Sequence, residues 1–93
     1  MTAKEVLVRT GVGLHARPAA ILVAAARPYA CRVMIEYNGR VVDAKSITQV
    51  LGLGVPDQAT VILRTDGERE EEVLAALAAL FERGLPQTTS ESP

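Results

Sequence analysis

A single histidine and a nearby arginine stand at the start of a predicted helix. His15 is the only histidine of the chain, and Arg17 follows it within Gly13-Leu14-His15-Ala16-Arg17-Pro18-Ala19-Ala20. A neutral imidazole has a nucleophilic nitrogen that can accept a phosphoryl group reversibly. The unpaired N–H groups of a first helical turn and the Arg17 guanidinium can balance the charge of that phosphate. The octapeptide therefore predicts a phosphate-carrying histidine. It predicts no metal site, because the residues near His15 supply no further metal ligands.

The small residues beside His15 favour an exposed site. Gly13 lets the backbone approach closely, and Ala16 leaves room beside the imidazole for a phosphohistidine of another protein. An alternative is that His15 only caps the helix and that Arg17 is a solvated side chain. We favour the phosphate site because these features coincide at one helix start.

Size and composition limit the classes of function. The 93 residues suffice for one small domain, and 10 Lys and Arg against 11 Asp and Glu give a net charge of −1, without the basic excess that nucleic acid selects. Cys31 is the only cysteine, which excludes an internal disulfide and fits a reducing compartment. No apolar run approaches the ~20 residues of a spanning helix, and residues 1–5 lack a signal-peptide pattern. We expect a cytoplasmic monomer that binds no nucleic acid and does not insert into membranes.

Four strands and three helices can be assigned along the chain. The Asn38-Gly39 pair suits a two-residue type I′ turn, Ser46 suits the N-cap of a short helix, and the acidic run at 70–72 suits the start of the last helix. We predict strands over residues 5–9, 32–37, 40–43 and 59–64, and helices over residues 16–27, 46–51 and 70–83. The polar residues 86–93 lack a core face, so we expect one domain over residues 1–85 and a disordered tail over residues 86–93.

The element order β-α-β-β-α-β-α predicts an α+β domain of two layers, with one sheet covered by helices on one face. The order alone identifies no function, since ferredoxin-like regulatory domains and small phosphatases share much of it. An acylphosphatase-like hydrolase using Arg17 as an anion clamp also needs an amide to orient water, and the only asparagine, Asn38, is explained by the turn. A regulatory or nucleic-acid-binding module is disfavoured because the chain has only three aromatic residues, Tyr29, Tyr37 and Phe81, and no basic strip interleaves with them. Both alternatives are therefore less favoured than a phosphate carrier.

Two segments of the chain resemble the signatures of one protein family. The octapeptide at 13–20, with Ala44-Lys45-Ser46-Ile47 and Leu53-Gly54-Val55, resembles HPr, the histidine-containing phosphocarriers of the phosphoenolpyruvate:sugar phosphotransferase system. The resemblance covers residues 3–85. It implies an open-faced β-sandwich whose four-stranded antiparallel sheet has the order 1-4-2-3 and is covered by three helices.

The resemblance also implies the reaction and the partners. His15 would take phosphate on Nδ1 from phospho-enzyme I and deliver it to a histidine of IIA sugar-transport components, with Arg17 assisting. Such a carrier catalyses no net reaction by itself and uses no cofactor. Its binding must be weak and rapid, which suits a small surface around one helix start.

A regulatory site and a docking surface follow from the same resemblance. Ser46 would be the target of HPr kinase/phosphorylase, although its capping role explains the residue equally well. The first two helices would form a joint surface for enzyme I and IIA, with apolar contacts at the centre and Arg27 at the rim. Ile47 and Leu51 are the docking candidates on this surface, and Ile47 is the better one, because a place in the core is the favoured interpretation for Leu51.

Three positions depart from the residues usual in the family. Val12 stands where many members carry Ser or Asn, which removes a side-chain cap and a phosphate contact. Thr48 replaces a bulky apolar residue, and Ala24 replaces a polar or basic one. These departures alter the surface around His15 and leave the imidazole chemistry as it is.

Overall fold

The computed structural model describes residues 1–85, so the tail predicted over residues 86–93 lies outside the described residues. Seven elements follow one another in the predicted order. The strands are β1 (Thr2–Leu7), β2 (Arg32–Tyr37), β3 (Arg40–Asp43) and β4 (Thr60–Asp66). The helices are α1 (Ala16–Ala26), α2 (Ile47–Gly52) and α3 (Glu70–Glu82).

The strands form one antiparallel sheet in the order β1-β4-β2-β3. β4 lies between β1 and β2, although it is the last strand of the chain. β2 and β3 are joined by the predicted tight turn, in which Asn38 and Gly39 have φ values of 55° and 83°. The predicted sheet order and hairpin are therefore confirmed.

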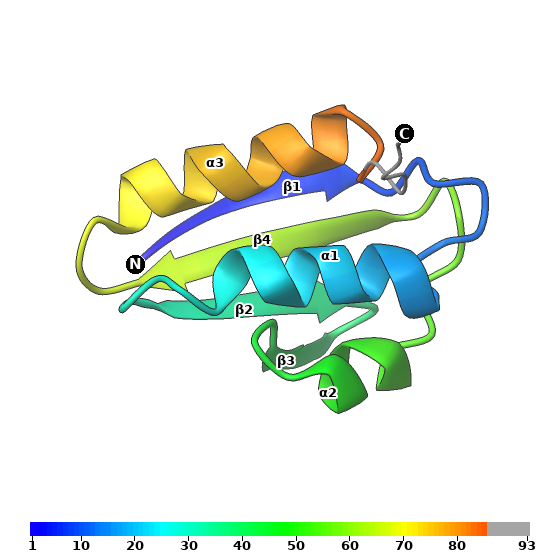
Figure 1. The fold of residues 1–93 in the computed structure, drawn as a ribbon, viewed down its shortest axis with the longest axis horizontal. Coiled ribbons are helices and arrows are strands. Elements are labelled where there is room, and N and C mark those ends of the chain that lie inside the picture. Colours follow the sequence, from blue (N-terminus) through cyan, green and yellow to red (C-terminus); the bar gives the residue numbers. More distant parts are fainter. Residues whose placement is uncertain (86–93) are drawn as a thin grey trace, which may run out of the picture.

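The three helices cover one face of the sheet (Figure 1). Alternate residues of the two central strands are buried beneath them, among them Ile35 of β2 and Leu63 of β4. The helices add the buried side chains Leu22, Val23, Val50, Val73, Leu77 and Phe81. The hydrophobic core thus lies between one helical layer and one sheet, as predicted for a two-layer α+β domain.

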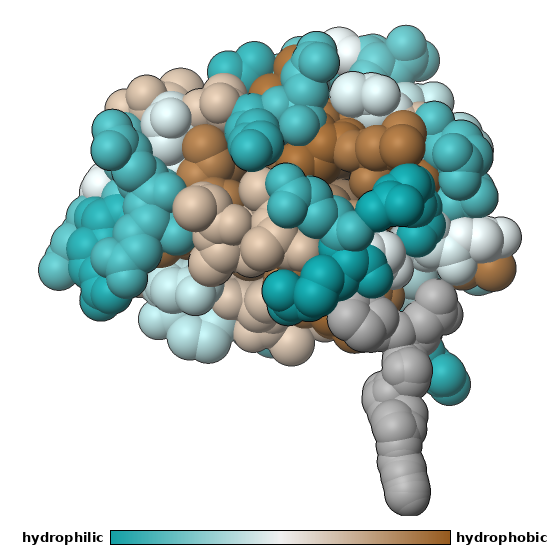
Figure 2. Space-filling model, turned by 90° about the horizontal axis from the view of Figure 1, so that it is seen from above, coloured by the Kyte–Doolittle hydropathy of each residue, from teal (hydrophilic) through white to brown (hydrophobic). Residues whose placement is uncertain are grey.

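The surface outside this core mixes apolar and hydrophilic residues. Figure 2 shows the molecule from above the view of Figure 1, and brown apolar and teal hydrophilic side chains lie next to one another there. On the open face of the sheet, Nη2 of Arg64 lies 2.7 Å from Oε1 of Glu36.

Within residues 1–85 no helix combines the length and the hydropathy that crossing a bilayer would require.

Two predicted strands have the wrong ends. β1 covers Thr2–Leu7 instead of residues 5–9, because its polar first half pairs with β4 from Thr2 opposite Thr65 onward. β4 reaches Asp66 instead of ending at residue 64, because β1 and β2 both extend alongside it. Backbone pairing with a neighbour, which local composition does not reveal, decides these boundaries.

Candidate functional site

His15 occupies the N-cap position of α1. Its backbone is extended, with φ −83° and ψ −168°, and its carbonyl accepts the N–H of Ala19 at 2.9 Å. The imidazole is exposed and makes no capping hydrogen bond. The side chain therefore contributes nothing to capping and is accessible to solvent.

The first turn of α1 provides uncompensated positive charge. It contains no acidic residue, and no hydrogen bond from the N–H of Ala16 or Arg17 is formed among residues 1–85. The exposed Arg17 guanidinium forms no ion pair within the same residues. Helix dipole, free N–H groups and guanidinium together make a suitable environment for an anion attached to His15.

Gly13 lies against the segment that precedes β4. Its φ is +71°, and a Cβ atom at this position would lie only 2.3 Å from the carbonyl oxygen of Val55. The N–H of Leu14 donates to the same oxygen at 3.0 Å. Gly13 is buried, and the close approach of its backbone is to Val55 of the same chain, which joins the loop before His15 to Val55.

Two residues of this loop system were not anticipated from the sequence, Thr10 and Asp57. Oδ1 of Asp57 accepts the N–H groups of Thr10 at 2.8 Å and Gly11 at 2.9 Å. The Thr10 hydroxyl donates to the carbonyl of Gly13 at 2.7 Å and accepts the N–H of Val12 at 3.1 Å. The bonds from Gly11 and Thr10 lower the pKa of the Asp57 carboxyl. Asp57 is separated from Thr10 by 47 positions, so no local sequence pattern could predict the contact.

The second helix presents the other predicted site residues. Ser46 is its N-cap, as predicted, and its Oγ accepts the N–H of Gln49 at 3.3 Å. Ile47 and Leu51 are 39% and 40% exposed, whereas Val50 is fully buried. The expectation that Leu51 belongs to the core is wrong, because Val50 takes the inward face of this short helix.

α1 and α2 contact each other, so their exposed faces form one surface. The N-terminal end of α1 lies toward α2 (Figure 1). Ala16 is exposed next to His15, and Arg27 is exposed as the C-cap of α1, about 18 Å from His15 along the helix axis. We call the exposed residues Ala16, Ile47 and Leu51 the α1–α2 surface, and Arg27 lies beyond it at the opposite end of α1.

Replacing Ser46 by alanine is expected to lower the free energy of unfolding by about 1 kcal/mol, because the N–H of Gln49 loses its capping acceptor. Denaturant unfolding measures this loss. Thr48→Ala is the control, since Thr48 is exposed in the same helix and should change stability by less than about 0.5 kcal/mol. Equal losses in the two variants would contradict a capping role for Ser46.

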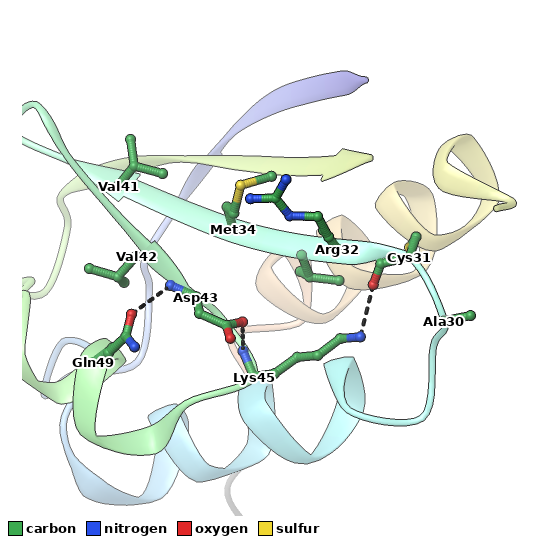
Figure 3. A pocket seen from close by; sticks show the side chains of 10 residues that line it. Ala30, Cys31, Arg32, Met34, Val41, Val42, Asp43, Lys45 and Gln49 are labelled. Atoms are coloured by element: carbon green, nitrogen blue, oxygen red, sulfur yellow. Dashed lines mark hydrogen bonds between the residues drawn. The ribbon is translucent and has the colours of Figure 1, made fainter. Parts of the chain in front are cut away.

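A groove in the described part of the chain is lined by residues other than His15. It has a volume of about 430 Å³ and runs beside β2 and β3, with Cys31, Met34, Val42 and Gln49 among its lining residues. Lys45 lies at one end of it, where Nζ donates to the carbonyl of Cys31 at 2.8 Å (Figure 3). The same Nζ also donates to the carbonyl of Tyr29 at 2.5 Å. Within residues 1–85 no group of three or more His, Cys, Asp and Glu side chains could hold a metal ion. His15 is exposed and is not among the residues that line this groove.

Residues 2–83 match the protein family described as PTS HPr component phosphorylation site. The HPr-like protein Crh of Halalkalibacterium halodurans is 39% identical over 83 residues, which are 89% of this chain and 99% of that protein. Among solved structures, HPr of Thermoanaerobacter tengcongensis is 36% identical with a TM-score of 0.87, over 90% of this chain and 94% of that chain. Phosphocarrier protein HPr of Bacillus anthracis is 38% identical with a TM-score of 0.82, over 86% and 95% of the two chains.

One of these relatives has also been crystallised as a dimer. The Thermoanaerobacter tengcongensis protein has a crystal structure as a dimer, with a TM-score of 0.71 and 39% identity over 80% of this chain and 85% of that chain. The family match and the fold agree with each other, and both include the helix start that bears His15. The chain therefore belongs to the HPr family of phosphocarrier proteins of the phosphotransferase system.

Proposed function

We propose that the protein accepts a phosphoryl group on Nδ1 of His15 from phospho-enzyme I and passes it to IIA sugar-transport components. In each step a phosphorus–nitrogen bond to one histidine breaks as a bond to the next histidine forms. The proposal rests above all on the exposed imidazole at the start of α1, which has no competing hydrogen bond from capping. The protein is the carrier between two partners rather than a catalyst with a turnover of its own.

The α1–α2 surface supports transfer between proteins. Ile47 and Leu51 supply exposed apolar area, and the small side chain of Ala16 lets a partner histidine approach the imidazole. Arg27 lies at the far end of α1 and serves as a rim contact. Gly13 acts through the backbone, because it holds the loop against Val55. A small contact of this kind forms and dissociates quickly, as a relay requires.

The function is tested by incubating the protein with enzyme I and phosphoenolpyruvate and measuring its intact mass. One phosphoryl group should be added, it should be lost in acid as expected of a phosphohistidine, and it should leave the protein when IIA is added. A protein that takes up no phosphate under conditions in which another HPr is fully labelled would show that the proposed function is wrong.

Regulation through Ser46 is a second candidate function. The observation in its favour is that the Ser46 side chain is only partly buried at the start of α2, on the same side of the molecule as the α1–α2 surface. A phosphate there would add about −1.5 to −2 charges beside the apolar residues that contact partners. Treatment with HPr kinase/phosphorylase and ATP should add an acid-stable phosphate that Ser46→Ala does not take, and failure to label the unaltered protein would contradict regulation by this enzyme.

We also propose that the protein acts as a monomer. A carrier must expose His15 and the α1–α2 surface to enzyme I and IIA in turn. Light scattering at micromolar concentration should give the mass of one chain. A stable dimer, as crystallised for the relative from Thermoanaerobacter tengcongensis, would contradict this proposal.

Replacing Arg17 by alanine is expected to slow phosphorylation by enzyme I about tenfold, because a charge-assisted hydrogen bond to the transferred group is lost. Arg17→Lys should restore part of the rate, since it keeps the charge but loses the planar fork of donors. Initial rates of labelling give both numbers. Arg32→Ala is the control, because Arg32 is also exposed but lines the groove beside β2 and β3, which His15 does not line. The role of Arg17 is wrong if both alanine variants slow labelling equally.

A further inference from the structure

The loop that leads into His15 is held by one carboxylate from a distant part of the chain. Oδ1 of Asp57 accepts the N–H groups of Thr10 and Gly11, at 2.8 and 2.9 Å. We propose that Asp57 is a positioning residue for phosphoryl transfer, because its carboxylate fixes the backbone that aims the imidazole of His15. This inference rests on the proposed function of His15.

Hydrogen bonds link the carboxylate to the residues that directly precede His15. Asp57 holds Thr10 by its N–H, and the Thr10 hydroxyl donates to the carbonyl of Gly13 at 2.7 Å. The next residue, Leu14, is buried and donates its N–H to Val55 at 3.0 Å. His15 follows directly in the chain, so contacts with the 55–57 segment constrain the backbone that leads into it.

The chemistry of the Asp57 carboxylate suits an anchor better than a solvated side chain. An ionised carboxylate accepting backbone N–H groups forms stronger bonds than a neutral acceptor. Oδ2 is also engaged, since Nε2 of Gln58 lies 3.2 Å from it. The two donors, Thr10 and Gly11, precede Gly13, whose backbone contacts Val55. The loop is therefore held against residues 55–57 by two separate contacts, one at Asp57 and one at Val55.

Positioning matters more at this site than in an enclosed active site. The imidazole is exposed and carries no hydrogen bond that would orient it from its own helix. A misplacement of about 1 Å of a reacting group can cost on the order of 100-fold in rate. The loop and helix backbone are therefore the main means by which this protein presents the nucleophile to a partner.

The test compares Asp57→Asn with Asp57→Ala. The asparagine keeps a side-chain oxygen that can accept both N–H groups, whereas alanine removes the acceptor. We expect Asp57→Ala to lower kcat for phosphorylation by enzyme I about tenfold with KM nearly unchanged, because the α1–α2 surface stays intact. Asp57→Asn should retain a rate within about threefold of the unaltered protein, because the geometry of the anchor is kept while the charge is lost.

A second measurement detects the anchor without enzyme I. The N–H groups of Thr10 and Gly11 should exchange with solvent at least about tenfold faster in Asp57→Ala than in the unaltered protein, while Asp57→Asn should protect them. Glu70→Ala is the control variant, because Glu70 accepts the N–H of Gly67 at 2.9 Å in the loop before α3. It should remove a comparable bond without changing the transfer rate.

The outcomes separate this inference from the proposed function. A labelled Asp57→Ala protein with an unchanged kcat overturns the positioning role alone. So does an Asp57→Asn protein as slow as Asp57→Ala, or a Glu70→Ala protein slowed to the same degree. If the unaltered protein accepts no phosphate, the proposed function fails, and the positioning role for transfer fails with it.

Discussion

Replacing His15 by alanine is expected to abolish labelling by enzyme I and phosphoenolpyruvate while leaving the fold unchanged. The imidazole is the only nucleophilic nitrogen of its kind in the chain, since His15 is its single histidine. The structural cost should be small, because the side chain is exposed and makes no capping hydrogen bond. Intact mass after labelling and a denaturant unfolding curve measure the two expectations on the same preparation.

The control for this variant is Ser46→Ala, which should keep full acid-labile labelling although it loses a helix cap. The pair therefore separates loss of a nucleophile from loss of local stability. An acid-labile phosphate on the His15→Ala protein would place the acceptor elsewhere. A large fall in its unfolding free energy would instead show that the imidazole has a structural role that the hydrogen bonds do not reveal.

The helix starts of α1 and α3 differ in charge, and the difference supports the anion proposed on His15. The first turn of α3 contains Glu70, Glu71 and Glu72, whose charges stabilise that helix end. The first turn of α1 contains no acid, so its positive end is left for an anion from outside. Pro18 lies in this turn and donates no N–H, so the free donors are concentrated at Ala16 and Arg17 next to the imidazole.

Much of the fold could be predicted because its signals are local. The Asn38-Gly39 pair has the positive φ angles of the predicted turn, and Ser46 accepts the N–H of Gln49 as an N-cap should. The place of β4 between β1 and β2 was implied only by the family resemblance, since strand order depends on contacts between distant segments. The strand ends were missed for the same reason.

The candidate site divides in a similar way. His15 and Arg17 could be singled out because their types and spacing carry the chemistry. Asp57 could not, because an aspartate between a proline and a glutamine reads as an ordinary loop residue until the fold brings it to Thr10. Leu51 was misplaced because one turn and a half of helix has too few residues to define its inward face.

Replacing Gly13 by alanine is expected to lower both the stability and the phosphoryl transfer. The added Cβ would lie 2.3 Å from the oxygen of Val55 and 2.9 Å from the nitrogen of Asp57, and both are backbone atoms that cannot rotate away. Positive φ costs a side chain about 1–2 kcal/mol, and crowding in a packed region costs about 1–3 kcal/mol. Denaturant unfolding should therefore show a loss of about 2–5 kcal/mol.

Gly11→Ala separates the two causes. Gly11 lies in the same loop with φ +86°, but a Cβ there meets no atom within 4 Å. It should cost about 1–2 kcal/mol, the contribution of positive φ alone, and labelling by enzyme I should fall less than in Gly13→Ala, because alanine keeps the N–H that Asp57 accepts. Gly13→Ala must also displace the loop from Val55, which shifts His15, so its labelling should fall at least about tenfold even where most of the protein is folded. Equal losses of rate in the two variants would mean that the contact between Gly13 and Val55 does not position the imidazole.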